Sequence, residues 1–139
     1  MSFKSISLSC ACALALSGSA WAHHSPANYD VGKVIQVTGM VTEYHFSNPH
    51  SWIYMTSIGE DGEPQAWSLE SGSTGQLVRR GWDTDSLKPG DQISVYIKPL
   101  RSGAYGGLLG VVVLSDGTNL CDLEGAPWPQ LGTVASACQ

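Results

Sequence analysis

The chain has few basic residues. Lys and Arg together number 7, against 12 Asp and Glu, and the formal net charge is −5. Proteins bind nucleic acids through stripes of Lys and Arg, because each contact neutralises a phosphate. The acidic balance therefore argues against nucleic acid as a partner.

The sequence also lacks the short motifs of common catalytic sites. It contains no G-x-S-x-G nucleophile elbow, no H-E-x-x-H zinc helix and no phosphate-binding loop. Its His and Glu side chains are suited to general acid–base chemistry, but no obvious nucleophile accompanies them. We therefore expect a binding protein rather than an enzyme.

Long apolar runs are missing too. A membrane-spanning helix needs roughly 20 apolar residues, whereas the uncharged apolar run from Ile6 to Leu16 is shorter. Lys4 precedes this run and Ala20-Trp21-Ala22 follows it, which is the order of a secretory signal with its cleavage site. We expect cleavage after Ala22, no stable membrane anchor, and a mature protein of 117 residues that is periplasmic or secreted. An uncleaved anchor is the alternative.

Cysteine is scarce in the expected mature chain, which keeps only Cys121 and Cys138. Two thiols in an oxidising compartment usually pair, so we expect a disulfide between them. It would close a loop of about 17 residues and contribute roughly 3 kcal/mol in the chain-entropy model. The spacing is too long for a C-x-x-C redox motif. Residues 121–139 are thus expected to form a disulfide-stapled tail.

Short strand patterns alternate with turns along the rest of the chain. Gly39 lies inside the first pattern, where a glycine often marks a bulge or a bend. A short helix is expected at residues 75–80, capped by Ser73 or Thr74 and ended by Gly81. The strand patterns, rich in β-branched and aromatic residues, cover residues 33–46, 51–58, 65–70, 92–98 and 108–114.

Five strands with one helix between the third and the fourth is the order found in the OB-fold. We therefore predict an all-β fold with one short helix, in the form of a small five-stranded Greek-key barrel. The barrel domain is expected over residues 23–120, after a signal peptide at residues 1–22. A bent first strand is what such a barrel needs to close. An open β-sandwich is the alternative.

Several segments share a pattern with a known family. They are His23-His24-Ser25, Asn48-Pro49-His50, Trp67-Ser68-Leu69-Glu70, Arg79-Arg80-Gly81-Trp82 and Ser86-Leu87-Lys88-Pro89-Gly90-Asp91. Together they resemble the bacterial domain of unknown function 6152 (DUF6152) family of small exported proteins, over nearly all of residues 22–118. The resemblance implies export and a barrel-like fold. It implies no activity, and it does not extend to the cysteine tail.

The histidines suggest a metal site. All four lie within 28 positions of one another. After cleavage His23 would be the amino terminus, where its α-amine and ring nitrogen form a chelate that suits Cu(II). His24 follows, and His50 would add another imidazole if the N-terminal arm folds back over the barrel. Glu70 is the candidate carboxylate, either as a ligand or as a group that orients His50. His45 is expected to matter less if strand alternation places it elsewhere.

Strand alternation predicts a second candidate surface. His50, Trp52 and Tyr54 share one face of the second strand pattern, and strands two and three carry the usual ligand surface of an OB-fold. The rival function is a metal-free module that binds a peptide, a glycan or a partner protein through Trp52 and Tyr54. Plainer alternatives stay open: the two rings belong to the core, Glu70 pairs with an arginine of the helix end, and the histidines have only structural roles.

Overall fold

The structure is a computed structural model that describes residues 26–123, 128–129 and 131–138. No helix within these residues is long and apolar enough to cross a membrane. The elements in chain order are η1 (Pro26–Asn28), β1 (Ile35–His45), β2 (Trp52–Ile58), β3 (Pro64–Glu70), α1 (Thr74–Val78), β4 (Gln92–Pro99), β5 (Gly106–Leu114), β6 (Asn119–Cys121) and α2 (Thr133–Ser136).

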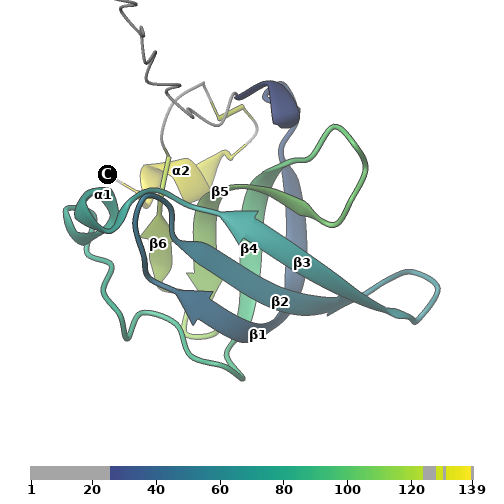
Figure 1. Cartoon of the computed structure of the whole chain (residues 1–139), viewed down its shortest axis with the longest axis horizontal. Helices are drawn as coiled ribbons and strands as arrows, with labels where there is room; N and C mark the ends of the chain where they lie inside the picture. The colour runs from purple at the N-terminus through teal and green to yellow at the C-terminus, as the bar shows by residue number, and fades with distance from the viewer. Residues whose placement is uncertain (1–25, 124–127, 130, 139) are drawn as a thin grey trace, which may run out of the picture.

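The strands form one sheet that closes on itself (Figure 1). Neighbouring strands follow the order β3-β2-β1-β4-β5-β6, and β3 also pairs with β5. This closing pairing is parallel, from Ser68 opposite Gly106 to Glu70 opposite Leu108, whereas consecutive neighbours in the order run antiparallel. Five strands thus make a closed barrel and β6 adds one more at the side. The predicted OB-like barrel is confirmed, and the open β-sandwich is wrong.

β1 changes partner half-way along its length. Its first half, Ile35–Met40, pairs with β4, and its second half, Met40–His45, pairs with β2. Gly39 lies at the changeover, where a Cβ atom would be 2.4 Å from the carbonyl oxygen of Thr56. Only a residue without a side chain tolerates so close an approach. The glycine expected to mark a bend therefore lies where β1 passes from one partner to the other.

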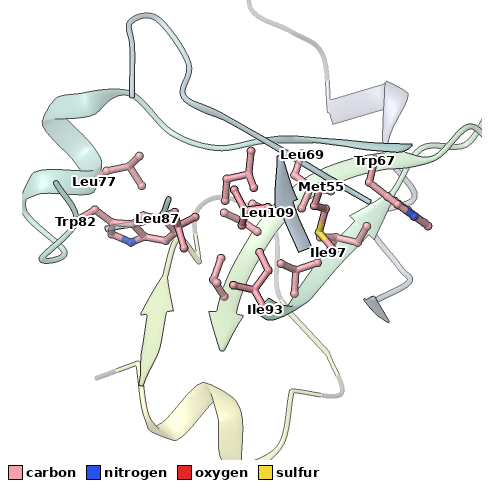
Figure 2. Packing of buried hydrophobic residues seen from close by; sticks show 13 residues of the cluster. Met55, Trp67, Leu69, Leu77, Trp82, Leu87, Ile93, Ile97 and Leu109 are labelled. Carbon is pink, nitrogen blue, oxygen red and sulfur yellow. The ribbon is translucent and has the colours of Figure 1, made fainter. Parts of the chain in front are cut away.

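The barrel interior is filled by alternate strand residues (Figure 2). In β2 the side chains of Ile53 and Met55 point inward and are completely buried. Leu77 of α1 and Trp82 of the loop that follows lie together at one end of the cluster, and Trp67 lies at the other. Removal of this apolar surface from water is the main favourable term in folding, and the segment after β3 contributes by closing one end of the barrel.

α1 carries the caps that its sequence predicts. The Ser73 side chain accepts from the amide of Gln76, and the Gln76 side chain accepts from the amide of Ser73, which is a capping box. At the other end Gly81 has a φ of +85°. The amides of Gly81 and Trp82 donate to the carbonyls of Val78 and Leu77, the pattern of a glycine-terminated helix. This turn directs Trp82 into the core.

The segment after β5 is attached to the barrel by strand pairing and a side-chain hydrogen bond, in addition to the expected disulfide. β6 pairs with β5, and the carbonyl of Cys121 accepts from the indole nitrogen of Trp82 at 3.0 Å. The predicted disulfide is confirmed: Cys121 is bonded to Cys138, with Cα atoms 5.7 Å apart. A strand of three residues is too short to leave a pattern in the sequence, so β6 was not predicted.

Trp128 covers part of the outer surface of the barrel. A Cβ atom on Gly110 of β5 would lie 2.4 Å from its ring, so the indole rests directly on the strand backbone. The Nζ atom of Lys98 is 4.1 Å from the centroid of the same ring. Lys98 is completely buried, and this burial lowers the pKa of its amine.

Candidate functional site

Glu70 and His50 lie against each other at the end of β3. The Nδ1 atom of His50 is 3.2 Å from Oε1 of Glu70 and 3.3 Å from the carbonyl oxygen of Ser71. Both neighbours are hydrogen-bond acceptors, which favours the neutral tautomer that has its proton on Nδ1 and its lone pair on Nε2. The pair therefore presents Nε2 as the nitrogen able to coordinate a metal.

Two loops joined by hydrogen bonds hold His50 in place. The side-chain oxygen of Asn48 accepts from the amide of Thr74 at 3.1 Å and from its hydroxyl at 3.0 Å. The amide of Ser51 donates to the carbonyl of Gly72 at 3.0 Å. The loop before β2 is thus fastened to the loop after β3 on both sides of His50. These contacts fix the backbone from which the imidazole projects.

Tyr29 brings the N-terminal arm to the same carboxylate. Its hydroxyl donates to Oε2 of Glu70, and the two residues are only 7% and 5% exposed. Burial, together with the bond to Glu70 and its negative charge, raises the pKa of the Tyr29 hydroxyl, so the hydroxyl remains the donor. The amide of Asp30 also donates to the carbonyl of Pro99 at 2.8 Å. The arm is therefore anchored on the barrel.

Sequence reasoning did not find Tyr29, because it lies 41 residues from its partner and no local pattern marks it. Among the predicted copper ligands, His50 and Glu70 are brought together, and Glu70 takes the position of an orienting group at Nδ1. His23 and His24 lie outside the described residues. Within the described ranges, no group of three or more His, Cys, Asp or Glu side chains is arranged to hold a metal ion.

Trp52 and Tyr54 point outward from β2, because Ile53 and Met55 take the inward positions. The alternative in which the two rings belong to the core is therefore wrong. Their planes differ by 17° and their centroids are 6.4 Å apart. His45 lies edge-on to Tyr54, with ring centroids 5.2 Å apart, so strand alternation places it on this surface and not elsewhere.

Cross-strand register arranges this surface in two rows over β1, β2 and β3. Trp52 lies opposite both His45 and Glu70, and Tyr54 lies opposite both Glu43 and Ser68. The Nε2 atom of His45 is 2.9 Å from Oε2 of Glu43, and both side chains are more than half exposed. We call these residues the aromatic face: Glu43, His45, Trp52, Tyr54, Ser68 and Glu70.

The arginine at the end of α1 has a different acidic partner. Arg80 contacts the carboxylate of Asp122, which is 3% exposed. The same carboxylate accepts from the hydroxyl of Ser71 and the amide of Gly72, each at 2.7 Å. The alternative in which Glu70 pairs with an arginine is therefore wrong. Asp122 instead links the end of β6 to the loop after β3, whose Ser71 carbonyl contacts His50.

Comparison with known proteins identifies the family. The chain matches a family of unknown function (DUF6152) over residues 12–110. It belongs to this family. The range matched in this DUF6152 protein is more than two thirds of the chain, and it contains Tyr29, His50 and Glu70 but ends before Cys121. A search of the curated proteins found no match.

Proposed function

We propose that this DUF6152 protein is exported and binds a copper ion, held by the amino-terminal His23, its neighbour His24 and the Nε2 atom of His50. The observation that supports this most is the contact of Tyr29 with Glu70, the carboxylate that also touches His50. A chain extends at most about 3.3–3.6 Å per residue. The amine that cleavage after Ala22 would create is six residues from Tyr29 and thus stays within about 22 Å of it.

The second support is the chemistry of His50. Metal-bound imidazoles commonly donate their other ring nitrogen to a carboxylate or a carbonyl, which fixes the ring and makes it a better ligand. His50 has both kinds of acceptor at Nδ1. In this proposal Glu70 is a positioning residue, and Tyr29 holds Glu70. Cu(II) favours such nitrogen donors in a planar arrangement.

Copper titration of the protein with its native amino terminus tests the proposal. We expect a one-to-one Cu(II) complex whose electron paramagnetic resonance spectrum shows nitrogen ligands. One residue added before His23 moves the amine out of its chelate, and His50→Ala removes a donor, so each should weaken binding by about tenfold or more. Affinity should fall at acidic pH, because an imidazole must be neutral to bind the metal.

Two further variants sharpen this test. Glu70→Gln should weaken Cu(II) binding while keeping the stoichiometry, because it changes the orienting group and leaves the donors. His45→Ala is the matched control, since its ring contacts Tyr54 and Glu43, and it should leave affinity unchanged. If neither the added residue nor His50→Ala changes affinity, the copper is only adventitious.

A second candidate function is a metal-free interaction module. The outward, half-buried rings of Trp52 and Tyr54 favour it. Large apolar side chains that lie together on a protein surface often mark a binding site. It would replace the copper proposal if the titration shows only adventitious binding.

A further inference from the structure

We propose that the aromatic face binds a neutral oligosaccharide, with its pyranose rings stacked on Trp52 and Tyr54. The inference deepens the second candidate function and does not depend on copper. It starts from the geometry of the two rings, which lie two residues apart on β2 with planes differing by only 17°. Two neighbouring rings along a strand offer consecutive aromatic contacts to a linear chain of similar units.

Polar groups border the rings where the hydroxyls of a sugar would lie. The Glu43–His45 pair is on the β1 side of the face, and Ser68 is on the β3 side, opposite Tyr54. Carboxylate oxygens accept hydrogen bonds, whereas imidazole and hydroxyl groups both donate and accept. A pyranose has an apolar C–H surface for the rings and a rim of hydroxyls for these groups, so its chemistry matches the face.

The negative charge of the protein argues against oligonucleotides, the main competing class of ligand. OB-folds use the face of strands two and three for oligonucleotides and oligosaccharides. The exposed residues of the aromatic face include the carboxylate of Glu43 and no Lys or Arg, and the chain as a whole carries a net charge of −5. Phosphate-rich ligands need the opposite charge. Of the two ligand classes, the oligosaccharide is the one that this face suits.

Strand pairing argues against an extended peptide. Peptides that add to a sheet need a strand edge with unpaired backbone groups. β2, which carries both rings, is paired with β1 on one side and with β3 on the other. The centre of the face therefore offers side chains only. Ring stacking and side-chain hydrogen bonds are the interactions that remain, and a sugar uses both.

Binding to an array of neutral oligosaccharides, followed by titration with soluble hexasaccharides such as cellohexaose, chitohexaose and maltohexaose, tests the inference. The mature protein is used with a metal chelator present. We expect saturable binding to at least one linkage class, measured by isothermal titration calorimetry so that the readout does not depend on Trp52. Trp52→Ala and Tyr54→Ala should each weaken it by about tenfold, whereas Trp52→Phe, which keeps a ring, should weaken it less.

Tyr96→Ala is the matched control, because Tyr96 is a half-buried tyrosine of β4, outside the aromatic face, and it should leave binding unchanged. Circular dichroism of each variant establishes that the barrel is folded. Absence of binding across the array overturns the inference, as does binding that survives Trp52→Ala. A single-stranded oligonucleotide or a lysine-rich peptide that binds where no sugar does also overturns it, while leaving an interaction module of another kind.

Discussion

At the scale of single residues, one buried carboxylate supplies a side-chain contact between the arm and the barrel, beside the backbone bond from Asp30 to Pro99. Glu70 accepts from Tyr29 on one oxygen and lies against His50 on the other. A buried carboxylate that loses a donor is costly, because water cannot replace it. The three side chains come from the arm, the loop before β2 and the end of β3, so this carboxylate joins the arm to two loops that hydrogen bonds already hold together.

Tyr29→Phe measures this contact. The change keeps the ring and removes the hydroxyl, so we expect the free energy of unfolding at pH 7 to fall by about 1–2 kcal/mol. Tyr96→Phe on β4 is the control and should change stability by less than about 0.5 kcal/mol. Chemical denaturation measures both. Equal stability of the Tyr29 variant and the native protein would show that the hydroxyl contributes nothing.

The same hydroxyl predicts how stability depends on alkaline pH. The folded state raises the pKa of Tyr29 above its reference value of 10.0, so above about pH 10 the unfolded chain releases a proton that the folded protein keeps. The contribution of Tyr29 is complete below that pH and declines as the pH rises. Tyr44, whose pKa is raised mainly by burial, acts in the same direction.

Lys98 changes the pH dependence of stability in the opposite direction to Tyr29. The effect of Tyr29 is therefore isolated by comparing variants that share this lysine. Burial lowers the pKa of Lys98, so its deprotonation favours the folded state as the pH approaches about 10.5. Native protein and Tyr29→Phe share this lysine. Unfolding free energies measured between about pH 9 and 11 should fall more steeply for the native protein. Parallel curves would contradict the assignment to Tyr29.

At the scale of elements, the end of α1 decides whether Trp82 reaches the core. Gly81 has positive φ, and a Cβ atom there would meet nothing within 4 Å, so backbone strain alone opposes a side chain. Gly81→Val should therefore cost about 1 kcal/mol or more. Gly75→Ala within the helix is the matched control: its Cβ would make only an ordinary contact and should be neutral or stabilising. Thermal unfolding of both variants tests the prediction.

Elements defined by local patterns were predicted from the sequence, and elements defined by long-range pairing were not. The alternation in β2 and β4, the Ser73 cap and the Gly81 stop each depend on neighbouring residues. The parallel pairing of β3 with β5 and the register that puts His45 opposite Trp52 join residues from separate strands, so no period in the sequence records them. The disulfide was predictable because only two cysteines remained.

The parts of the candidate site that depend on local patterns were likewise predicted from the sequence, and the parts that depend on long-range contacts were not. Strand alternation correctly put Trp52 and Tyr54 on one face of the second strand. Sequence reasoning left open whether Glu70 ligates a metal or orients His50, since only coordinates give the contact at Nδ1. Tyr29 was missed because its role comes entirely from where the arm lies.

At the scale of the whole molecule, the disulfide should stabilise the fold without being needed for it. The bond spans 17 residues, for which the chain-entropy model gives about 3 kcal/mol. Replacing Cys121 and Cys138 with Ser should lower the unfolding free energy by about that amount. The near-ultraviolet circular dichroism should persist, because the five barrel strands close without the bond.

Reduction provides the control for this prediction. A reductant should destabilise the native protein by a similar amount and leave the double Ser variant unaffected. Complete loss of folded structure on reduction would show that the barrel depends on the tail. Alkylation of both thiols in freshly isolated protein would show that the bond does not form where the protein works.

Native mass spectrometry of the protein released from the periplasm tests export and copper binding together. We expect a chain of residues 23–139 with one internal disulfide and one bound copper ion, and we expect the copper to be lost from the His50→Ala variant. A chain that retains Met1, or residues 23–139 without any metal, would contradict this expectation.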